Sequence, residues 1–472
     1  MSAVSTGLQE GDVIDGFGVG ERLHAGGMGV LHRCTPPPDR PDLDFPLVIK
    51  VPRLGPGEPS ESVVTYEVEV TVHSVLTGPH VPRFVAAGDL ARQPYVVMER
   101  IEGPSLKEWV DRAPLPATEV ASLGASIATA LHAVHAQEVV HLDVKPANIL
   151  LRPDGSAVLV DFGLARHGHF PDLLAEEFHH PMGSGPYISP EQVLGVRWDP
   201  RSDLFALGVI LYQLATGEYP HGAPTSRRGL RRRLWHIPRS PRRVRPELPE
   251  WLQEVILRCL EPQAAGRYAS AAQVASDLAQ PEQVTVTERG RRLRRPGPGT
   301  LLKRWIMAAG YEPSPLDRPS QQLATASIVL AAVATQHRSE PRFQALREVV
   351  GRLMAVGADR RLTCVTVIRP ASELAGGSAE EAGTSQRIKH LVLLRHWAEP
   401  LGLPPERISY HVIESSDPAA ALLEYARSNQ VEHVVIGAPP ADVPLKGTFV
   451  STRVAAEATC SVTVVRPRFT PG

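Results

Sequence analysis

Two short polar motifs stand close together in the N-terminal half of the sequence. The first is HLDVKPAN, residues 141–148, and the second is DFG, residues 161–163. Each follows a run of apolar residues, so both are expected on loops, where reactive side chains are commonly placed. Phosphoryl transfer needs cations against the developing charge and an acceptor that orients the attacking hydroxyl, and the charged side chains of these motifs could supply both. These two motifs together indicate phosphoryl transfer.

Residues that could hold a phosphorylated substrate lie upstream. The turn LHAGGMG, residues 23–29, is rich in glycine, and its backbone amides could approach phosphates closely, although many tight turns have this composition. Lys50 ends the apolar run LVIK, and Glu69 lies on an expected helix from which it could pair with that lysine. Glu67 is the rival partner, but Glu69 is better placed relative to the apolar residues of the helix.

Three further motifs follow in a fixed order: Ser189-Pro190-Glu191, the segment DLFALG that starts at Asp203, and Arg267 in EPQAAGRY. With the motifs above, this series resembles the protein kinase family, in the eukaryotic-like serine/threonine form found in bacteria. The resemblance implies a bilobal kinase fold over residues 1–280. A match of this many motifs in order is specific, whereas each motif alone is weak.

The resemblance assigns roles to individual residues. Asp143 would orient the hydroxyl of the substrate, and Lys145 would neutralise charge on the transferred group. Lys145 also resembles the serine/threonine-specific kinases. The implied sets are catalytic Asp143, Lys145, Lys50 and Glu69; ATP-binding Gly26, Gly27, Gly29, Leu31, Lys50, Met98, Glu99 and Ile101; metal-binding Asn148 and Asp161; structural Glu191, Asp203 and Arg267. ATP and Mg²⁺ are the implied cofactors, with Mn²⁺ as an alternative metal.

The sequence departs from the family pattern at several positions. Leu142 replaces an arginine that normally receives an activation-loop phosphate, which predicts activity that is not controlled in that way. The other departures are His24, Val48, Ser184 and Ser189. None of them removes a charged catalytic group, so an active kinase for protein serine and threonine is expected, with the chain itself among its candidate substrates. The alternative is a nucleotide-binding pseudokinase that acts as a scaffold. A small-molecule kinase is disfavoured by Lys145 and by the motifs that follow it.

Apolar periodicity indicates the elements that position these residues. Val120, Leu123 and Ile127 recur at helical spacing, which predicts a helix over Thr118–Gln137. After residue 322, strands and helices alternate, which predicts an α/β domain with a parallel sheet. The expected order is strand 328–334, helix 342–356, strand 362–368, helix 386–397, strand 408–413, helix 418–428, strand 433–436, helix 449–458 and strand 462–465.

The end of this second region resembles the universal stress protein family. The fold class implied for the chain is therefore multidomain, with an α+β kinase followed by an α/β domain over residues 323–472. Nucleotide-binding members carry an aspartate after the first strand, where this chain has Ala334, and a second loop glycine, where it has Pro440. The loop from Gly437 to Gly447 is also short, although Gly447-Thr448 remains. We expect a regulatory or dimerising module without strong ATP binding.

Composition limits the remaining possibilities. A net charge of −1 gives the whole chain no bias toward nucleic acid or membrane. Nine arginines lie between Arg227 and Arg245, and they fit either a solvated surface or a docking patch for acidic partners, while nucleic acid remains unlikely because only Trp235 is interleaved. The four separated cysteines and the apolar stretch Leu323–Val333, which is too short for a membrane span, predict a cytoplasmic location.

A Pro-, Gly- and Arg-rich segment, residues 281–322, reads as a linker with a helical piece near Leu301–Ala309.

Overall fold

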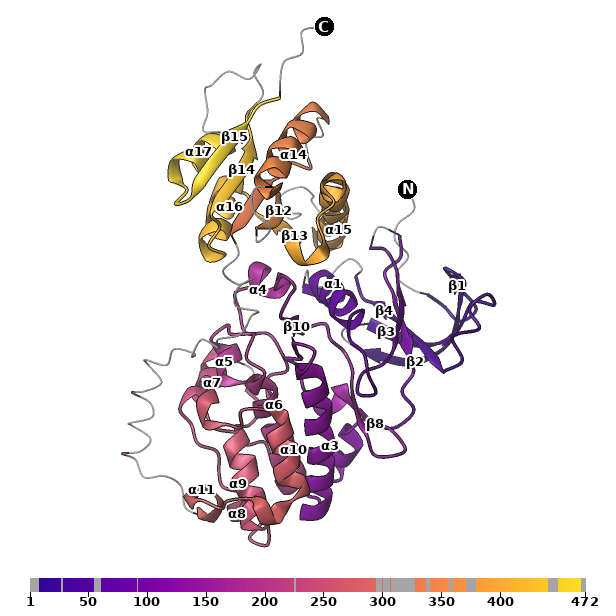
Figure 1. Cartoon of the computed structure of the whole chain (residues 1–472), viewed down its shortest axis with the longest axis vertical. Coiled ribbons are helices and arrows are strands. Elements are labelled where there is room, and N and C mark those ends of the chain that lie inside the picture. The colour runs from indigo at the N-terminus through magenta and orange to yellow at the C-terminus, as the bar shows by residue number, and fades with distance from the viewer. Residues whose placement is uncertain are drawn as a thin grey trace.

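The structure is a computed structural model of the whole chain, shown in Figure 1. It describes residues 8–26, 29–54, 61–90, 92–224, 226–293, 299, 306, 327–336, 340–355, 360–370, 379–439 and 449–467, without the side chains of 379–385. The helical piece expected near Leu301–Ala309 lies outside these residues, except for Ile306.

The N-terminal lobe is an antiparallel sheet that packs against one long helix. Its strand order is β1-β2-β3-β4-β6-β5. The bounds are β1 Val13–Ile14, β2 Phe17–Gly26, β3 Gly29–Thr35, β4 Leu47–Pro52, α1 Glu61–His73, β5 Phe84–Ala87 and β6 Val96–Glu99. Strands β4 and β6 are buried almost throughout, which explains why their apolar runs show no alternation. This lobe places Lys50 on β4 and Glu69 on α1.

The lower lobe is built around a buried helix, α6, Arg201–Thr216. Every residue of α6 after its first is buried, and Gly217 ends the helix in the left-handed conformation with φ 77°. The expected helix Thr118–Gln137 is confirmed as α3, Ala117–His135. The other helices of this lobe are α2 Lys107–Asp111, α4 Leu173–Glu177, α5 Pro190–Val193, α7 Arg227–Arg231, α8 Pro241–Val244, α9 Glu250–Cys259, α10 Ala271–Ala279 and α11 Glu288–Arg291.

Two small antiparallel strand pairs hold the polar motifs between the lobes. Strand β7, Val139–Val140, pairs with β10, Arg166–His167, and β8, Ile149–Leu151, pairs with β9, Ala157–Leu159. The 3₁₀ turn η1, Pro146–Asn148, lies between β7 and β8. The first polar motif therefore runs from the end of β7 to the start of β8, and the DFG motif lies in the loop between β9 and β10.

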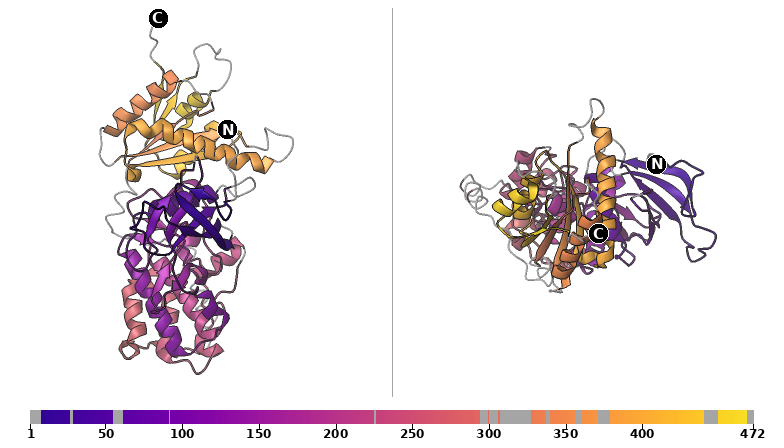
Figure 2. Two further views of the ribbon diagram at one scale, coloured as in Figure 1. Left: turned by 90° about the vertical axis from the view of Figure 1, so that its right-hand side faces the viewer. Right: turned by 90° about the horizontal axis from the view of Figure 1, so that it is seen from above.

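The C-terminal domain is a parallel five-stranded sheet with helices on both faces, as Figure 2 shows. The strand order is β13-β12-β11-β14-β15, and every pairing is parallel, which confirms the expected α/β architecture. The bounds are β11 Ile328–Ala332, α14 Glu340–Ala355, β12 Arg361–Ile368, α15 Ala379–Ala398, β13 Ile408–Glu414, α16 Pro418–Ser428, β14 His433–Gly437, α17 Val450–Glu457 and β15 Ser461–Val465. Helix α15 begins seven residues earlier than the sequence pattern indicates.

The segment between the two domains begins as part of the lower lobe. Helix α11 packs against α9, and the buried carboxylate of Glu254 accepts hydrogen bonds from Thr287, Arg289 and Gly290. All four cysteines are free; Cys34, Cys259 and Cys364 are buried and Cys460 is half-buried. No helix among the described residues is both long enough and apolar enough to cross a membrane.

Candidate active site

A buried lysine meets two carboxylates where β4, α1 and the loop after β9 converge. The Lys50 Nζ atom lies 2.7 Å from Oε2 of Glu69 and 2.9 Å from Oδ1 of Asp161. Burial alone would lower the pKa of Lys50, but Asp161 and Glu69 outweigh that effect and raise it. Burial would likewise raise the pKa of Asp161, but Lys50 dominates and lowers it. The lysine is therefore cationic, and Asp161 is an anion.

A second polar cluster surrounds Asp143. Its Oδ2 atom accepts from Lys145 Nζ at 2.6 Å and from Asn148 Nδ2 at 3.2 Å, and its Oδ1 atom accepts from the backbone amide of Ser184 at 2.9 Å. Asn148 Nδ2 also donates to the backbone carbonyl of Asp143 at 3.0 Å. Lys145 also lowers the pKa of Asp161, which links this cluster to the first one. The predicted catalytic and metal-binding side chains are thus brought together.

Asp203, at the start of α6, holds the loop that carries Asp143. Its carboxylate accepts from the backbone amides of His141 at 2.9 Å and Leu142 at 2.8 Å, and from His135 Nε2 at 2.8 Å. Leu142 is buried and has φ 62°, a conformation that costs a bulky residue on the order of 1–3 kcal/mol. The two amide contacts offset that cost and fix the loop on the central helix.

Four rings from both lobes form a continuous series of ring contacts, here called the stack, in which Phe84 is half-buried and the other three rings are buried; the sequence motifs do not reveal it. The ring centroids of His73 and Phe84 are 5.6 Å apart, those of His73 and Phe162 are 5.7 Å apart, and those of His141 and Phe162 are 5.0 Å apart. His73 lies on α1, one turn after Glu69, and its Nε2 atom donates to the carbonyl of Pro82 at 2.7 Å. The stack joins α1 to both polar motifs.

The buried His73 makes stability depend on pH. Burial is the main cause that lowers its pKa below the ordinary value of 6.5, and Lys50 adds to the effect. As the pH falls below that ordinary value, the unfolded chain binds a proton that the folded state resists. We expect the free energy of unfolding to decrease as pH falls from neutral through the lowered pKa, and this decrease to be smaller in His73→Phe. Urea unfolding at pH 7.5 and at about pH 5.5 measures the difference.

A matched control for this titration is His396→Phe. This variant makes the same exchange of histidine for phenylalanine at a side chain that is 83% exposed rather than buried. Equal pH slopes for the wild type and the His73 variant would contradict the assignment.

The predicted structural residues form a buried ion pair below the site. Arg267 donates two parallel hydrogen bonds to Glu191, of 2.5 and 2.8 Å, and Ser202 donates to the same carboxylate at 2.9 Å. Ser189 caps α5, and its hydroxyl accepts from the amide of Gln192 at 3.2 Å. The serine that departs from the family pattern therefore has a structural role at this position.

One arginine of the basic run 227–245 is a buried anchor rather than a surface residue. Arg233 is fully buried, and its guanidinium donates to the carbonyls of Ile188, Gly185 and Pro186, the last two at 2.6 and 3.1 Å. Neither sequence interpretation of the run anticipates this role, because neighbouring arginines give the same signal as Arg233. Six arginines of the run are exposed: Arg227, Arg228, Arg231, Arg232, Arg239 and Arg243.

The residues assigned to nucleotide binding line the N-terminal lobe. Gly26 and Gly29 are paired across the β2–β3 turn, and Gly27 lies outside the described residues. A Cβ atom on Gly29 would lie 2.5 Å from the carbonyl oxygen of Val51, and φ is 153°, so only glycine fits there. The others lie on β3 (Leu31), on β6 (Met98 and Glu99) or just beyond it (Ile101), and the Glu99 carboxylate pairs with Arg152 at 2.8 Å.

The C-terminal domain has a cavity of its own at the ends of its parallel strands. It has a volume of about 450 Å³, and its lining includes Ala334, Thr366, Arg342 and Gly437. Pro440, Gly447 and Thr448 lie outside the described residues. Position 334 is an alanine, and none of the described residues that line this cavity carries a carboxylate.

Comparison with known proteins gives a family for each of the two domains. Residues 47–278 match the protein kinase domain family, and residues 328–466 match the universal stress protein family. The chain therefore contains a protein kinase domain of the bacterial serine/threonine class, followed by a universal stress protein domain.

Individual relatives match about half of this chain. A probable serine/threonine-protein kinase of Clostridium perfringens is 31% identical over 219 residues, which cover 46% of this chain and 32% of the relative. The serine/threonine-protein kinase Pkn1 of Myxococcus xanthus is 33% identical over 297 residues, which cover 61% of this chain and 41% of the relative. The crystal structure of the PknI kinase domain of Mycobacterium tuberculosis is 24% identical, covers 58% of this chain and 99% of that one, and has a TM-score of 0.46. The chain spans about a third to two fifths of the length of these curated relatives.

Proposed function

We propose that this chain is an ATP- and Mg²⁺-dependent kinase that transfers the γ-phosphate to serine or threonine hydroxyls of proteins, with the chain itself among its substrates. The observation that supports the proposal most directly is the joint contact of Lys50 with Glu69 and Asp161. Such a cation at the centre of the site can hold the phosphates of a nucleotide.

Asp143, Lys145 and Gly29 have separate proposed roles in the reaction. In this proposal the Asp143 carboxylate accepts the proton of the attacking hydroxyl, and Lys145, whose Nζ atom lies 2.6 Å from that carboxylate, supplies positive charge beside the transferred group. Gly29 permits the close backbone approach that a phosphate cradle needs.

The oxygen donors of the site fit a magnesium ion. Because Asn148 donates through Nδ2 to Asp143, its Oδ1 atom is the one that remains for a metal, together with the carboxylate of Asp161. Mg²⁺ is commonly held by one or two such protein oxygens along with substrate phosphates, and it neutralises their charge when bound. No cluster of three acidic, histidine or cysteine ligands occurs among the described residues, and waters together with substrate phosphates would complete the octahedral coordination.

Incorporation of γ-labelled phosphate from ATP tests the proposal. In the presence of Mg²⁺ or Mn²⁺, the wild type is expected to transfer labelled phosphate to itself or to a generic protein substrate. This transfer is expected to stop when a chelator removes the metal. Asp143→Ala is expected to show no labelling, because the acceptor for the hydroxyl proton is gone. If the wild type binds ATP but labels nothing under any of these conditions, the chain is instead a pseudokinase scaffold.

We also propose that the second domain is a regulatory module rather than a strong ATP-binding site, and that a homodimer through this domain is one arrangement to test. The absence of a carboxylate at Ala334 supports the first point. Calorimetric titration of the full chain should then give one nucleotide per chain, whereas two equivalent sites would contradict it.

A further inference from the structure

Helix α4, in the segment between the DFG motif and Ser189, lies against the C-terminal domain. It contacts both α1 of the kinase domain and β13 of the C-terminal domain. Figure 1 shows the C-terminal domain resting on α4 and α1. Glu176 and Glu177 end this helix, and Glu176 is only 7% exposed.

Glu176 is held almost entirely by the C-terminal domain. Its carboxylate accepts from Ser409 Oγ at 3.0 Å, His411 Nε2 at 2.9 Å and Tyr425 OH at 3.2 Å, and it forms an ion pair with Arg361. Burial would raise the pKa of Glu176, but Arg361 and His411 outweigh it and lower that pKa. These donors compensate the burial of the Glu176 charge, because an unpaired buried carboxylate would be strongly unfavourable.

Two more glutamates of the kinase domain meet arginines of α15. Glu177 pairs with Arg387, and Glu67 of α1 pairs with Arg395. Each contact therefore joins an acidic residue of the kinase domain to a basic residue of the C-terminal domain. This charge complementarity sets the orientation of the two domains.

Glu67 and Glu69 place α1 between the two domains. Residues two apart on a helix are separated by a rotation of about 200° around its axis, so their side chains point to nearly opposite sides. Glu69 therefore faces Lys50 in the kinase site, while Glu67 faces Arg395 in the C-terminal domain. The position of α1 that forms the Lys50–Glu69 contact is held from the opposite side by the second domain.

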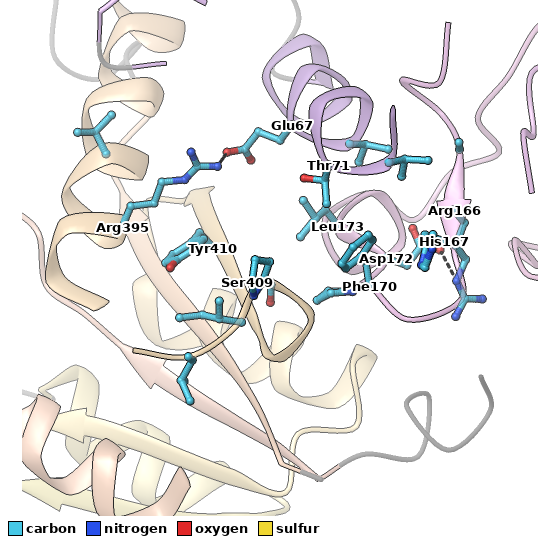
Figure 3. A pocket seen from close by; sticks show the side chains of 18 of the residues that line it. Glu67, Thr71, Arg166, His167, Phe170, Asp172, Leu173, Arg395, Ser409 and Tyr410 are labelled. Atoms are coloured by element: carbon cyan, nitrogen blue, oxygen red, sulfur yellow. Dashed lines mark hydrogen bonds and ion pairs between the residues drawn. The ribbon is translucent and has the colours of Figure 1, made fainter. Parts of the chain in front are cut away.

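Apolar packing and an open cavity accompany these ion pairs. Val63 and Tyr66 of α1 share one buried cluster with Ile388 and Leu391 of α15. Next to it lies a cavity of about 600 Å³. Figure 3 shows its walls, with Arg395 and Tyr410 of the C-terminal domain opposite Glu67, Thr71 and Leu173 of the kinase domain. Because the cavity interrupts the apolar packing between the two domains, we assign the choice of their relative orientation to the charged contacts.

The docking gives this chain, which has Leu142 before Asp143, a way to order the segment between the DFG motif and Ser189. The position before Asp143 carries no cation to receive a phosphate, and its side chain is buried. The carboxylates of α4 are instead neutralised by arginines from the second domain. These carboxylates are permanent charges, so they need no phosphorylation.

We propose that the basic face of the C-terminal domain, formed by Arg361, Arg387, Arg395 and His411, is the docking surface for α1 and α4 of the same chain, and that this docking sustains phosphoryl transfer. The second clause rests on the proposed kinase function. The first clause concerns only the contact between the domains, and it can be tested without a measurement of kinase activity.

The test uses a reciprocal charge swap in the full chain. Glu67→Arg and Arg395→Glu each place like charges together, whereas the double variant restores an ion pair in reverse. The Arg395 side chain is 43% exposed, so its replacement is expected to leave the C-terminal domain folded. Arg352→Glu is the matched control, since Arg352 is an exposed arginine of α14 in the same domain.

Two readouts separate docking from function. Each single variant is expected to speed amide hydrogen exchange in residues 61–73 and 173–177 and to lower phosphate incorporation about tenfold or more, with both effects reversed in the double variant. Exchange rates equal to those of the wild type in both single variants would overturn the docking surface. Protection that depends on protein concentration would also overturn it, because the partner would then be a second copy. Altered exchange with unaltered incorporation would overturn the functional clause alone. If the wild type is inactive, the proposed kinase function fails, and exchange still decides the docking.

Discussion

Lys50→Met is expected to lower the rate of phosphoryl transfer by about 10²–10³-fold, the usual effect of removing one preorganised electrostatic group. The lysine is the cation between Glu69 and Asp161, with contacts of 2.7 and 2.9 Å. Without it, two carboxylates face one another in a buried site, and one of them is expected to bind a proton because its pKa rises. Initial rates of phosphate incorporation at low and saturating ATP measure the effect.

The exposed Lys107 supplies a matched control for this variant. Lys107→Met removes the same charge from α2, outside the site, and is expected to retain the wild-type rate. Circular dichroism of Lys50→Met would show whether its fold is kept. A folded Lys50→Met protein with the wild-type rate would disprove the role assigned to Lys50.

Glu191→Ala is expected to destabilise the kinase domain by about 3–5 kcal/mol, the cost of leaving one partner of a buried ion pair without the other. Glu191 is 1% exposed and Arg267 is 3% exposed, so water cannot replace the lost carboxylate. The variant also removes the acceptor of Ser202. Such a loss is comparable to the whole stability of many domains, so a large shift in the urea midpoint is expected.

Two further proteins complete this experiment. In Glu191→Ala/Arg267→Ala both charges are absent, and its destabilisation should be smaller than the sum of the two single effects. Glu247→Ala breaks a pair with Arg245 in which the glutamate side chain is 65% exposed, so it should leave the midpoint nearly unchanged. Additive single effects at Glu191 and Arg267 would show that the pair is not coupled.

The sequence predicted the C-terminal alternation and helix α3 because their apolar residues recur with regular periods. The contacts around Lys50 and Asp143 could be anticipated because the motif order resembles a known family. The ring of His73 in the stack could not be predicted in this way, because it belongs to no motif and only the fold brings it beside Phe162. Arg233 gave no separate signal within a run of similar residues.

Long-range pairings were the least accessible to sequence reasoning. Glu67 was considered only as a rival partner for Lys50, whereas the structure pairs it with Arg395. The two residues are 328 positions apart, and no local period or spacing relates them. Whether two oppositely charged residues meet depends on domain docking, which is decided by the shape and charge of whole surfaces.

The distribution of the thiols has a practical consequence for spectroscopy. Burial raises the pKa of the Cys34 thiol to about 11 and that of Cys259 to about 12, so neither forms a reactive thiolate at neutral pH. Cys364 is fully enclosed, whereas Cys460 is half-buried just before β15. A maleimide dye should therefore attach first at Cys460, which would give a single fluorescent reporter on the C-terminal domain without removing any other cysteine.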